Sequence, residues 1–370
     1  MRLLTVSNVP IEAHLGSGYV VGGYVERLRA RGHHVDTREP RDYERLPRLR
    51  AAKRLRMLWD YSAAVAGALR RADYDVVELW GAESWWIARR LARRAVRPLV
   101  VARSNGLEPH FAETLARHGV APRLGVLGAW FDRVQNVESA FRCADAVTTV
   151  SHFDRRFAVA RGYQPEARLL TLENPLPDDL LGQPFAVERP PVIGFFGSWL
   201  PNKGGDLLAA ALPAVLAVHP EWRARFVGSV ESDVRRALPV EIAARVETQP
   251  FVADRARLQA LYRKTAIVAM PSAFESFGLV AAEAMACGCA LAASPVGFAA
   301  ELRPDVEAVL VAERSPGAWA AALRTLAGDA ARRQRIARAG HARVQTLRWE
   351  EAVTRLVHFY EQRLAERAGR

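Results

Sequence analysis

Two glutamates eight residues apart stand in a segment that reads as a strand, a loop and a helix. The strand is expected to end at Met270, Glu275 lies in the loop, and Gly278 opens the helix that carries Glu283. The first backbone N–H groups of a helix lack intrahelical partners and can hold a phosphate. Carboxylates accept hydrogen bonds from sugar hydroxyls, so the two glutamates could hold two hydroxyl-bearing parts of a ligand around that phosphate. This arrangement suits a nucleotide sugar.

The alternative interpretation of these glutamates is structural. Glu275 would be a helix-capping carboxylate and Glu283 an ordinary surface residue, and two glutamates at this spacing also occur by chance. However, Glu275 and Glu283 are the only charged residues between Lys264 and Glu301. A solvated helix face would normally carry more polar residues. The apolar surroundings of Glu283 therefore favour ligand binding.

Strands alternate with helices along the chain around these residues. Apolar strands are expected at 3–7, 33–36, 75–79, 99–102 and 146–150 in the first half, and at 192–196, 225–227, 266–269 and 290–293 in the second. Such alternation implies parallel βαβ units. Each half begins with a strand, a glycine-containing loop and a helix. The sequence therefore predicts an α/β fold with two Rossmann-like domains facing each other across a cleft, with ligands at the carboxyl ends of the strands.

A proline-rich stretch separates the two halves. Five of the 21 prolines fall between Pro175 and Pro191, which marks this stretch as the best domain boundary. We expect an N-terminal domain over residues 1–185 and a C-terminal domain over residues 186–370. The last helix, at about 349–367, has apolar residues at helical spacing, so one of its faces must be buried. It either packs on the second domain or crosses back to the first.

The segment around the two glutamates resembles the signature of the retaining glycosyltransferases of family 4, which have the GT-B fold. In that signature a Pro-Ser pair, a glutamate, Phe-Gly and a second glutamate recur in the order found at 271–283. The specific motifs lie in the second half, and the resemblance covers residues 144–151, 173–175, 197–204, 261–262, 292–297 and Glu301. It implies a hexosyltransferase that moves a sugar from a nucleotide sugar to a hydroxyl acceptor, either a lipid-linked, envelope or polysaccharide glycan or a small molecule.

The resemblance implies a donor site that lies mainly in the second domain. Glu275 would face the hydroxyls of the donor sugar, Glu283 would bind the ribose, and Lys203 would neutralise the leaving diphosphate as the glycosidic bond breaks. Lys203 is one of only three lysines, and its alternative role is that of an exposed lysine in a turn. The other donor-binding residues that the resemblance implies are Gly278, Leu279, Val280, Ser276, Phe277 and Ser198, with Gly16 and Gly18 from the first domain.

Two positions depart from the family pattern. Ser198 stands where the family usually has an arginine, so one of two phosphate-binding cations is missing or supplied elsewhere. Asn105 stands where many relatives carry a histidine beside the acceptor, and an asparagine cannot act as a base. Arg103 and His110 are nearby candidates for phosphate and acceptor contacts, although a lone histidine is more often structural.

Gly16 and Gly18 resemble a first-domain loop of the family, in which close approach of the backbone to the donor phosphates or the acceptor requires glycine. The loop is expected to precede a helix at 19–31 that ends at Gly32. It is not the full dinucleotide-binding fingerprint, because no third glycine is correctly spaced. A nicotinamide-dependent oxidoreductase is therefore a remote alternative.

No dedicated carboxylate nucleophile is evident in the sequence. The hypothesis is a same-face substitution, in which the donor diphosphate, held by Lys203 and helix amides, helps to deprotonate the incoming hydroxyl. These groups replace a metal ion, and no carboxylate pair has metal-like spacing, so neither a metal nor another cofactor is expected. The alternatives are a sugar-nucleotide epimerase of the same fold, an inverting transferase, or a catalytically silent sugar-binding homologue. The presence of both glutamates and Lys203 argues against the last.

Positive charge is concentrated in the first domain. The chain has 52 basic and 40 acidic residues, a net charge of +12, and residues 1–100 contribute 19 basic and 11 acidic residues, a net charge of +8. Since donor chemistry is assigned to the second domain, this excess points to an anionic acceptor or an anionic membrane surface. Residues 45–59 mix six cations with apolar residues, which suits either a basic amphipathic helix on a membrane or a helix packed on the first domain. No nucleic acid is expected as a partner, because no recognised binding module is present.

The cysteines and the N-terminus indicate the compartment. Cys143, Cys287 and Cys289 are too few for a disulfide framework, and Cys287-Gly-Cys289 without a nearby histidine cluster is a poor zinc site. The N-terminus lacks the apolar core of a signal peptide, and no uncharged stretch reaches the ~20 apolar residues that span a bilayer. We expect a cytoplasmic protein that is either free or peripheral at the inner face of the membrane.

Overall fold

The chain divides into two compact units in a computed structural model that describes residues 1–46, 53–120 and 136–369. The first unit comprises Met1–Glu113, Ala121–Pro175 and Trp349–Arg370, and the second comprises Thr114–Val120 and Leu176–Arg348. The main division therefore falls between Pro175 and Leu176, earlier than the boundary expected at residue 185. Part of the basic segment at 45–59 lies outside the described residues.

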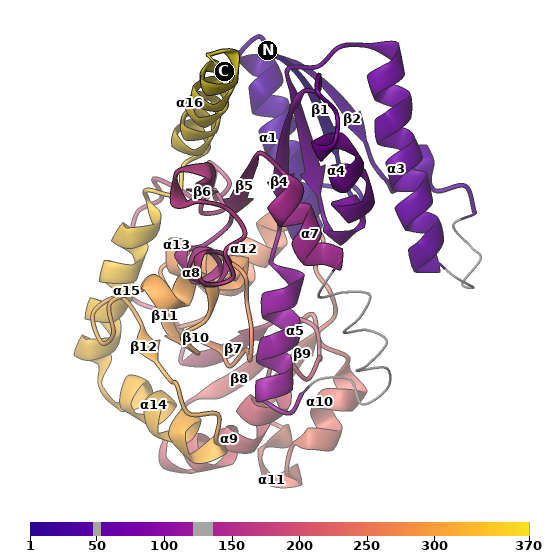
Figure 1. Cartoon of the computed structure of the whole chain (residues 1–370). Helices are drawn as coiled ribbons and strands as arrows, with labels where there is room; N and C mark the ends of the chain where they lie inside the picture. Colours follow the sequence, from indigo (N-terminus) through magenta and orange to yellow (C-terminus); the bar gives the residue numbers. More distant parts are fainter. Residues whose placement is uncertain (47–52, 121–135, 370) are drawn as a thin grey trace. The chain divides into compact units, whose positions relative to one another are not determined.

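A parallel sheet of six strands forms the centre of the first unit, with the strand order β2-β1-β3-β4-β5-β6 (Figure 1). The strands are β1 (Arg2–Val6), β2 (His34–Arg38), β3 (Val76–Trp80), β4 (Leu99–Arg103), β5 (Ala146–Thr149) and β6 (Leu169–Thr171). Central strands β3 and β4 are fully buried, as expected for a parallel sheet covered on both faces. The predicted Rossmann-like architecture of this half is confirmed.

Helices of the first unit follow the strands in alternation. The longer ones are α1 (Gly16–Ala30), α3 (Lys53–Arg71), α4 (Trp85–Ala92), α7 (Asn136–Cys143) and α8 (His152–Ala160). Helix α5 (Glu108–Arg117) begins in this unit, and its residues from Thr114 on are assigned to the second. Helix α1 begins at Gly16 rather than at residue 19, so Gly16 and Gly18 are helical and do not form the loop that the sequence suggested. A Cβ atom on Gly18 would lie 2.4 Å from the carbonyl oxygen of Pro10. This glycine is therefore required for packing against the chain's own backbone.

The second unit contains another parallel sheet of six strands, with the order β12-β11-β10-β7-β8-β9 (Figure 1). The strands are β7 (Val192–Phe196), β8 (Arg223–Val227), β9 (Val246–Gln249), β10 (Ile267–Met270), β11 (Ala290–Ala293) and β12 (Val309–Leu310). The main helices are α9 (Gly205–Val218), α10 (Glu231–Ala237), α12 (Arg255–Arg263), α13 (Leu279–Ala286), α14 (Pro316–Gly328) and α15 (Ala330–Val344). If the six strands of this unit are numbered 1 to 6 along the chain, their order in the sheet is 6-5-4-1-2-3. Read from the other edge, this is 3-2-1-4-5-6, the Rossmann order.

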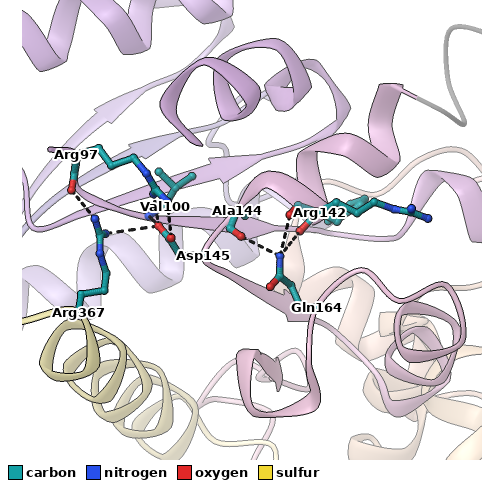
Figure 2. A network of polar contacts seen from close by, with 8 residues as sticks. Arg97, Val100, Arg142, Ala144, Asp145, Gln164 and Arg367 are labelled. Atoms are coloured by element: carbon teal, nitrogen blue, oxygen red, sulfur yellow. Dashed lines mark hydrogen bonds and ion pairs between the residues drawn. The ribbon is translucent and has the colours of Figure 1, made fainter. Parts of the chain in front are cut away.

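The C-terminal helix α16 (Trp349–Ala368) belongs to the first unit. The ring of Trp349 packs edge-on against Tyr24 of α1, with 5.2 Å between ring centroids. At the other end of α16, Arg367 donates to the carbonyl oxygen of Arg97 at 2.8 Å and lies 3.5 Å from Asp145, as Figure 2 shows. Asp145 also accepts from the backbone N–H of Val100 at 2.8 Å, so this carboxylate links α16 to the sheet. The chain thus returns to its first unit after completing the second.

Candidate functional site

The site is positioned by the strand order of the second sheet. Strands β7 and β10 are neighbours there, and the chain leaves them toward opposite sides of the sheet. In open α/β sheets, ligands bind at such a switch point, outside the carboxyl ends of the strands. The loop after β7 carries Lys203, and the loop after β10 carries Glu275. Topology thus places these two predicted residues at one edge of the sheet.

The two loops are held together by their backbones. The N–H of Ala273 donates to the carbonyl oxygen of Asn202 at 2.8 Å. Gly204, which follows Lys203, has a φ of 72°, and a Cβ atom there would lie 2.3 Å from the carbonyl oxygen of Pro271. Both its backbone conformation and its close approach therefore require glycine. This contact fixes Lys203 relative to the loop that carries Glu275.

A lysine–glutamate pair lies where the two loops meet. The Nζ atom of Lys203 donates to Oε1 of Glu275 at 2.7 Å, and the hydroxyl of Ser272 donates to the same oxygen at 2.8 Å. The Lys203 side chain is 32% exposed and that of Glu275 is 14% exposed. The pair can therefore meet a ligand, and Glu275 is oriented by two donors and is not a free carboxylate in a loop.

Helix α13 begins directly after this loop. Gly278 precedes it with a φ of 88°, in the left-handed conformation that favours glycine. Leu279 and Val280 open the helix and are partly exposed, and N–H groups at this position have no intrahelical acceptor. Ser276 is also partly exposed, whereas the ring of Phe277 is buried 5.2 Å from that of Phe298. Phe277 can therefore contribute only its backbone to a ligand site.

Glu283 lies further along α13, largely buried against Tyr262 and Arg255. Its carboxylate is 14% exposed, accepts from the hydroxyl of Tyr262 at 3.3 Å and lies 3.8 Å from Arg255. Burial raises the pKa of Glu283. The charge of Arg255 and, next in size, the hydrogen bond from Tyr262 act to lower this pKa and offset part of the rise. The ring of Tyr262 is itself stacked on Phe196 at the end of β7, with 4.0 Å between centroids. This geometry differs from that of an ordinary surface glutamate.

Arginines near the site were missed by sequence reasoning. Arg255 opens α12, far from the glutamate motif in sequence, and nothing in its local pattern indicates its proximity to Glu283. Arg314 donates to the carbonyl oxygen of Pro271 at 2.6 Å, and burial lowers its pKa. Ser198, which replaces the usual arginine, is exposed. Arg314 therefore brings a guanidinium to the loops of the site, although it is far in sequence from Ser198, the position at which the family usually has an arginine.

The structure places Arg103 in the interior of the first unit. Its guanidinium donates to Glu78 at 2.8 Å and lies between the rings of Tyr24 and Trp80, at 4.1 and 4.3 Å from their centroids. Glu78 also accepts from Tyr360 of α16. Both members of the ion pair are buried. Arg103 therefore joins the sheet to the C-terminal helix, and in this arrangement its side chain does not face a solvent-accessible site.

His110 and Asn105 follow β4 in the first unit. His110 is buried, its Nδ1 atom lies 2.8 Å from Asp154, and its ring stacks on Phe157 with 4.3 Å between centroids. Asn105 is partly exposed, and its Oδ1 atom is buried without a hydrogen bond to any other described residue. The packing of His110 is that of a structural histidine, whereas Asn105 keeps an unused acceptor.

Cysteines and metal-ligating residues form no separate site in the described part of the chain. Cys287 and Cys289 are buried, and burial raises the pKa of the Cys287 thiol to about 12. Such thiols are protonated and poorly reactive at neutral pH. Among the described residues, no three His, Cys, Asp or Glu side chains are grouped so that they could hold a metal ion.

Comparisons with known proteins match both units. A family profile described as "Glycosyltransferase Family 4" matches residues 16–179, and one described as "Glycosyl transferases group 1" matches residues 190–329. A D-inositol 3-phosphate glycosyltransferase from Xylanimonas cellulosilytica is 34% identical over 220 residues, which cover 56% of this chain and 52% of the relative. Its namesake from Salinispora tropica is 35% identical over 199 residues, which cover 50% of this chain and 40% of the relative. The chain thus spans about half the length of these curated relatives or less.

Solved structures resemble the whole chain. Sucrose-phosphate synthase from Thermosynechococcus elongatus has a TM-score of 0.80 at 21% identity, with coverage of 99% of this chain and 100% of that one. The Anabaena protein HepE in complex with UDP-glucose has a TM-score of 0.70 at 20% identity, with coverage of 98% and 100%. At this level of identity, the likeness establishes the fold. The two-domain, Rossmann-like GT-B fold expected from the sequence is confirmed.

Proposed function

Since the chain belongs to glycosyltransferase family 4, we propose that it transfers a sugar from a nucleotide diphosphate sugar to a hydroxyl acceptor with retention of anomeric configuration. The observation that carries this proposal is the 2.7 Å contact between Lys203 and Glu275 at the switch point of the second sheet. It brings a cation together with a carboxylate that could accept from sugar hydroxyls, in the loop that leads into α13. A diphosphate and a sugar need these groups side by side.

The donor is best accommodated by the second unit. The diphosphate would lie at the start of α13 against Leu279 and Val280, with Lys203 beside its oxygens. Glu275 would accept hydrogen bonds from the sugar hydroxyls, and Glu283 would accept them from the ribose. HepE was solved with UDP-glucose bound, which supports a nucleotide sugar as the donor for this chain. Lysine and helix amides carry the phosphate charge, so the proposal includes no metal ion or other cofactor.

The proposed reaction is a substitution on one face of the sugar. The bond between the anomeric carbon and the diphosphate oxygen breaks, and its electron pair leaves with the diphosphate. The acceptor oxygen forms its bond to the same carbon from the same face, and its proton passes to an oxygen of the departing diphosphate. Lys203 stabilises the negative charge that develops on the leaving group.

The acceptor is proposed to be anionic. Residues 1–100 carry a net charge of +8, and this half of the chain is left to hold the acceptor. The curated relatives are named D-inositol 3-phosphate glycosyltransferase, and the phosphate in that name carries negative charge at neutral pH. A lipid-linked or envelope glycan that carries phosphate would suit the same surface, at the cytoplasmic face of a membrane.

A thermal-shift screen tests the donor site. The full chain would be heated with UDP-, GDP-, ADP- and dTDP-sugars, because a ligand that binds only the native state raises its apparent stability, by about 2.7 kcal/mol at a hundred times its Kd. The matching donor should shift the wild-type Tm and shift that of Lys203→Ala much less. Failure of every nucleotide sugar to stabilise the protein would refute the proposal.

Product analysis tests the stereochemistry. With the matching donor and a phosphorylated polyol acceptor, the anomeric configuration of the product is read by proton NMR. A retained configuration supports the proposal, whereas an inverted product would identify an inverting transferase. Donor binding with neither transfer nor hydrolysis across a panel of acceptors would instead favour a sugar-binding homologue without catalysis.

A further inference from the structure

An exposed patch of tryptophans and arginines lies on helices α3 and α4 of the first unit, which pack side by side (Figure 1). Its apolar part is Leu55 and Trp59 on α3 and Trp86 on α4. Trp59 is 63% exposed, Leu55 is 58% exposed and Trp86 is 36% exposed. The rings of Trp59 and Trp86 lie beside each other across the two helices, with 6.3 Å between centroids. A gathered, exposed aromatic patch of this kind usually marks an interaction site.

Four arginines continue this patch along α4 and its C-terminal end. Arg89, Arg90, Arg93 and Arg94 are all exposed. None of them forms an ion pair with another residue in the described part of the chain. The sequence contains no acidic residue between Glu83 and Glu108, so their charge is not compensated locally. We call these four arginines together with Leu55, Trp59 and Trp86 the Trp–Arg face.

We propose that the Trp–Arg face docks the protein on an anionic lipid surface. Tryptophan rings partition to the headgroup level of a bilayer, where an apolar body and a polar N–H are both accommodated. Arginines beside them are attracted by the negative potential of anionic lipids. No helix in the described part of the chain is long and apolar enough to cross a membrane. Exposed tryptophans flanked by unpaired arginines suit a surface that lies against lipid headgroups.

The positive charge of the Trp–Arg face favours an anionic membrane over a second copy of the chain as its partner. A two-fold symmetric dimer through this face would bring the same patch of each copy together, and so four arginines against four arginines. Like charges facing each other oppose such an interface. An anionic leaflet offers both the opposite charge and an apolar layer for Leu55 and the two tryptophans. Of the segment 45–59, in which a membrane contact was expected, the proposal uses Leu55 and Trp59, and it adds residues of α4. It does not depend on the transfer activity.

Vesicle co-sedimentation of the full chain tests the proposal. Vesicles of phosphatidylcholine alone are compared with vesicles that contain phosphatidylglycerol, at low and at high salt. The protein should sediment only with the anionic vesicles, and binding should weaken as salt screens the arginines. Each cation near an anionic surface strengthens binding about fivefold, so Arg90→Gln/Arg93→Gln should weaken it about 25-fold.

Matched control variants distinguish an effect of this face on vesicle binding from an effect of net charge or of exposed apolar side chains in general. Arg324→Gln/Arg335→Gln removes two exposed arginines from α14 and α15 of the second unit and should leave binding unchanged. Trp59→Ser/Trp86→Ser should abolish sedimentation, while loss of the exposed Phe251 side chain of the second unit in Phe251→Ser should not. The thermal unfolding midpoint of each variant, compared with that of the wild type, reports whether it is folded.

Three outcomes would overturn the proposal. The first is equal sedimentation with neutral and anionic vesicles. The second is an equal loss of binding in the Arg90→Gln/Arg93→Gln variant and its second-unit control, which would show that only net charge matters. The third is binding to a single-stranded oligonucleotide that requires Trp59 and Trp86 while vesicles are ignored, which would assign the face to nucleic acid.

Discussion

Nζ of Lys203 lies 2.7 Å from Oε1 of Glu275, although the two residues come from loops that follow different strands. The contact exists because β7 and β10 are neighbours in the sheet and because Gly204 lets the first loop touch the backbone of Pro271. In the proposed reaction, Glu275 would hold Lys203 in place before a ligand arrives and so orient the cation for the leaving diphosphate.

Loss of either member of this pair should impair transfer with little loss of stability. Lys203→Met removes the charge that stabilises the leaving group, and we expect kcat to fall by about 100-fold or more. Glu275→Gln should also lower kcat, because the sugar loses a charged acceptor and Lys203 loses its partner. Since the pair is partly exposed, either change should alter the free energy of unfolding by no more than about 1 kcal/mol. Steady-state kinetics and denaturant unfolding measure the two effects.

Lys264→Met is the matched control for these variants, because Lys264 ends α12 away from both loops. It should keep wild-type kcat and KM. Full activity in Lys203→Met would remove Lys203 from the reaction, whereas a large loss of stability would mean that the pair mainly holds the loops together.

Glu283 should make stability depend on pH in a direction unusual for a carboxyl group. Burial raises its pKa above the ordinary value of 4.5, so the native state holds this proton more tightly than the unfolded state does. The protonated Glu283 therefore adds to the free energy of unfolding. This contribution is fully present below pH 4.5 and disappears as the pH rises from 4.5 through the raised native pKa. Glu283→Gln lacks this titration. The stability of the variant relative to the wild type should therefore increase across that window in urea unfolding.

The same substitution separates stability from binding. A charged acceptor for the ribose hydroxyls contributes about 1.5–3 kcal/mol, so Glu283→Gln should weaken donor binding about 10- to 100-fold even where the variant is the more stable protein. Isothermal titration at pH 7 measures this affinity. Unchanged affinity would place the ribose elsewhere, without affecting the proposed role of Lys203.

Strands β7 and β11 could be predicted to the residue because apolar runs end at Gly197 and at Ser294-Pro295. The edge strands β6, β9 and β12 were not predicted, since they are only two to four residues long and two of them have no fully buried position. Motif spacing indicated Glu275, Glu283 and Gly278 as site residues. It could not reveal Arg255 or Arg314, because their proximity to the site arises from packing between segments distant in sequence.

Gly204→Ala should damage both stability and catalysis more than a substitution at a glycine of the same conformation elsewhere. Gly182 has a φ of 73° and nothing within 4 Å of an added Cβ, whereas at Gly204 the Cβ would meet the carbonyl oxygen of Pro271. The left-handed conformation alone costs about 1–2 kcal/mol for alanine, and this is the loss expected for Gly182→Ala. Gly204→Ala should lose at least about 1 kcal/mol more, because the backbone clash adds strain. Its kcat should also fall, as Lys203 moves with the loop, while Gly182→Ala keeps wild-type kcat. Equal effects of the two substitutions on unfolding and on kcat would contradict the proposed contact between the loops.

Arg103→Met should destabilise the first unit severely. The substitution leaves Glu78 charged and buried without its cation, and breaking such a pair costs about 3–5 kcal/mol. Arg235→Met, which breaks an exposed pair with Glu231 on α10, should cost no more than about 1 kcal/mol.

The double variant Glu78→Gln/Arg103→Met distinguishes a structural Arg103 from one that binds the acceptor. Tyr360 and Thr5 donate to different oxygens of Glu78, Thr5 at 2.6 Å. Glutamine removes the unpaired charge, keeps one oxygen that can accept from Tyr360, and offers an amide N–H to the hydroxyl oxygen of Thr5. The double variant should therefore be more stable than Arg103→Met alone, as chemical unfolding would show. Its KM for the acceptor, which does not depend on the fraction of folded enzyme, should equal that of the wild type. A raised KM in the stable double variant would return Arg103 to the acceptor site, because restored packing cannot replace a lost guanidinium contact.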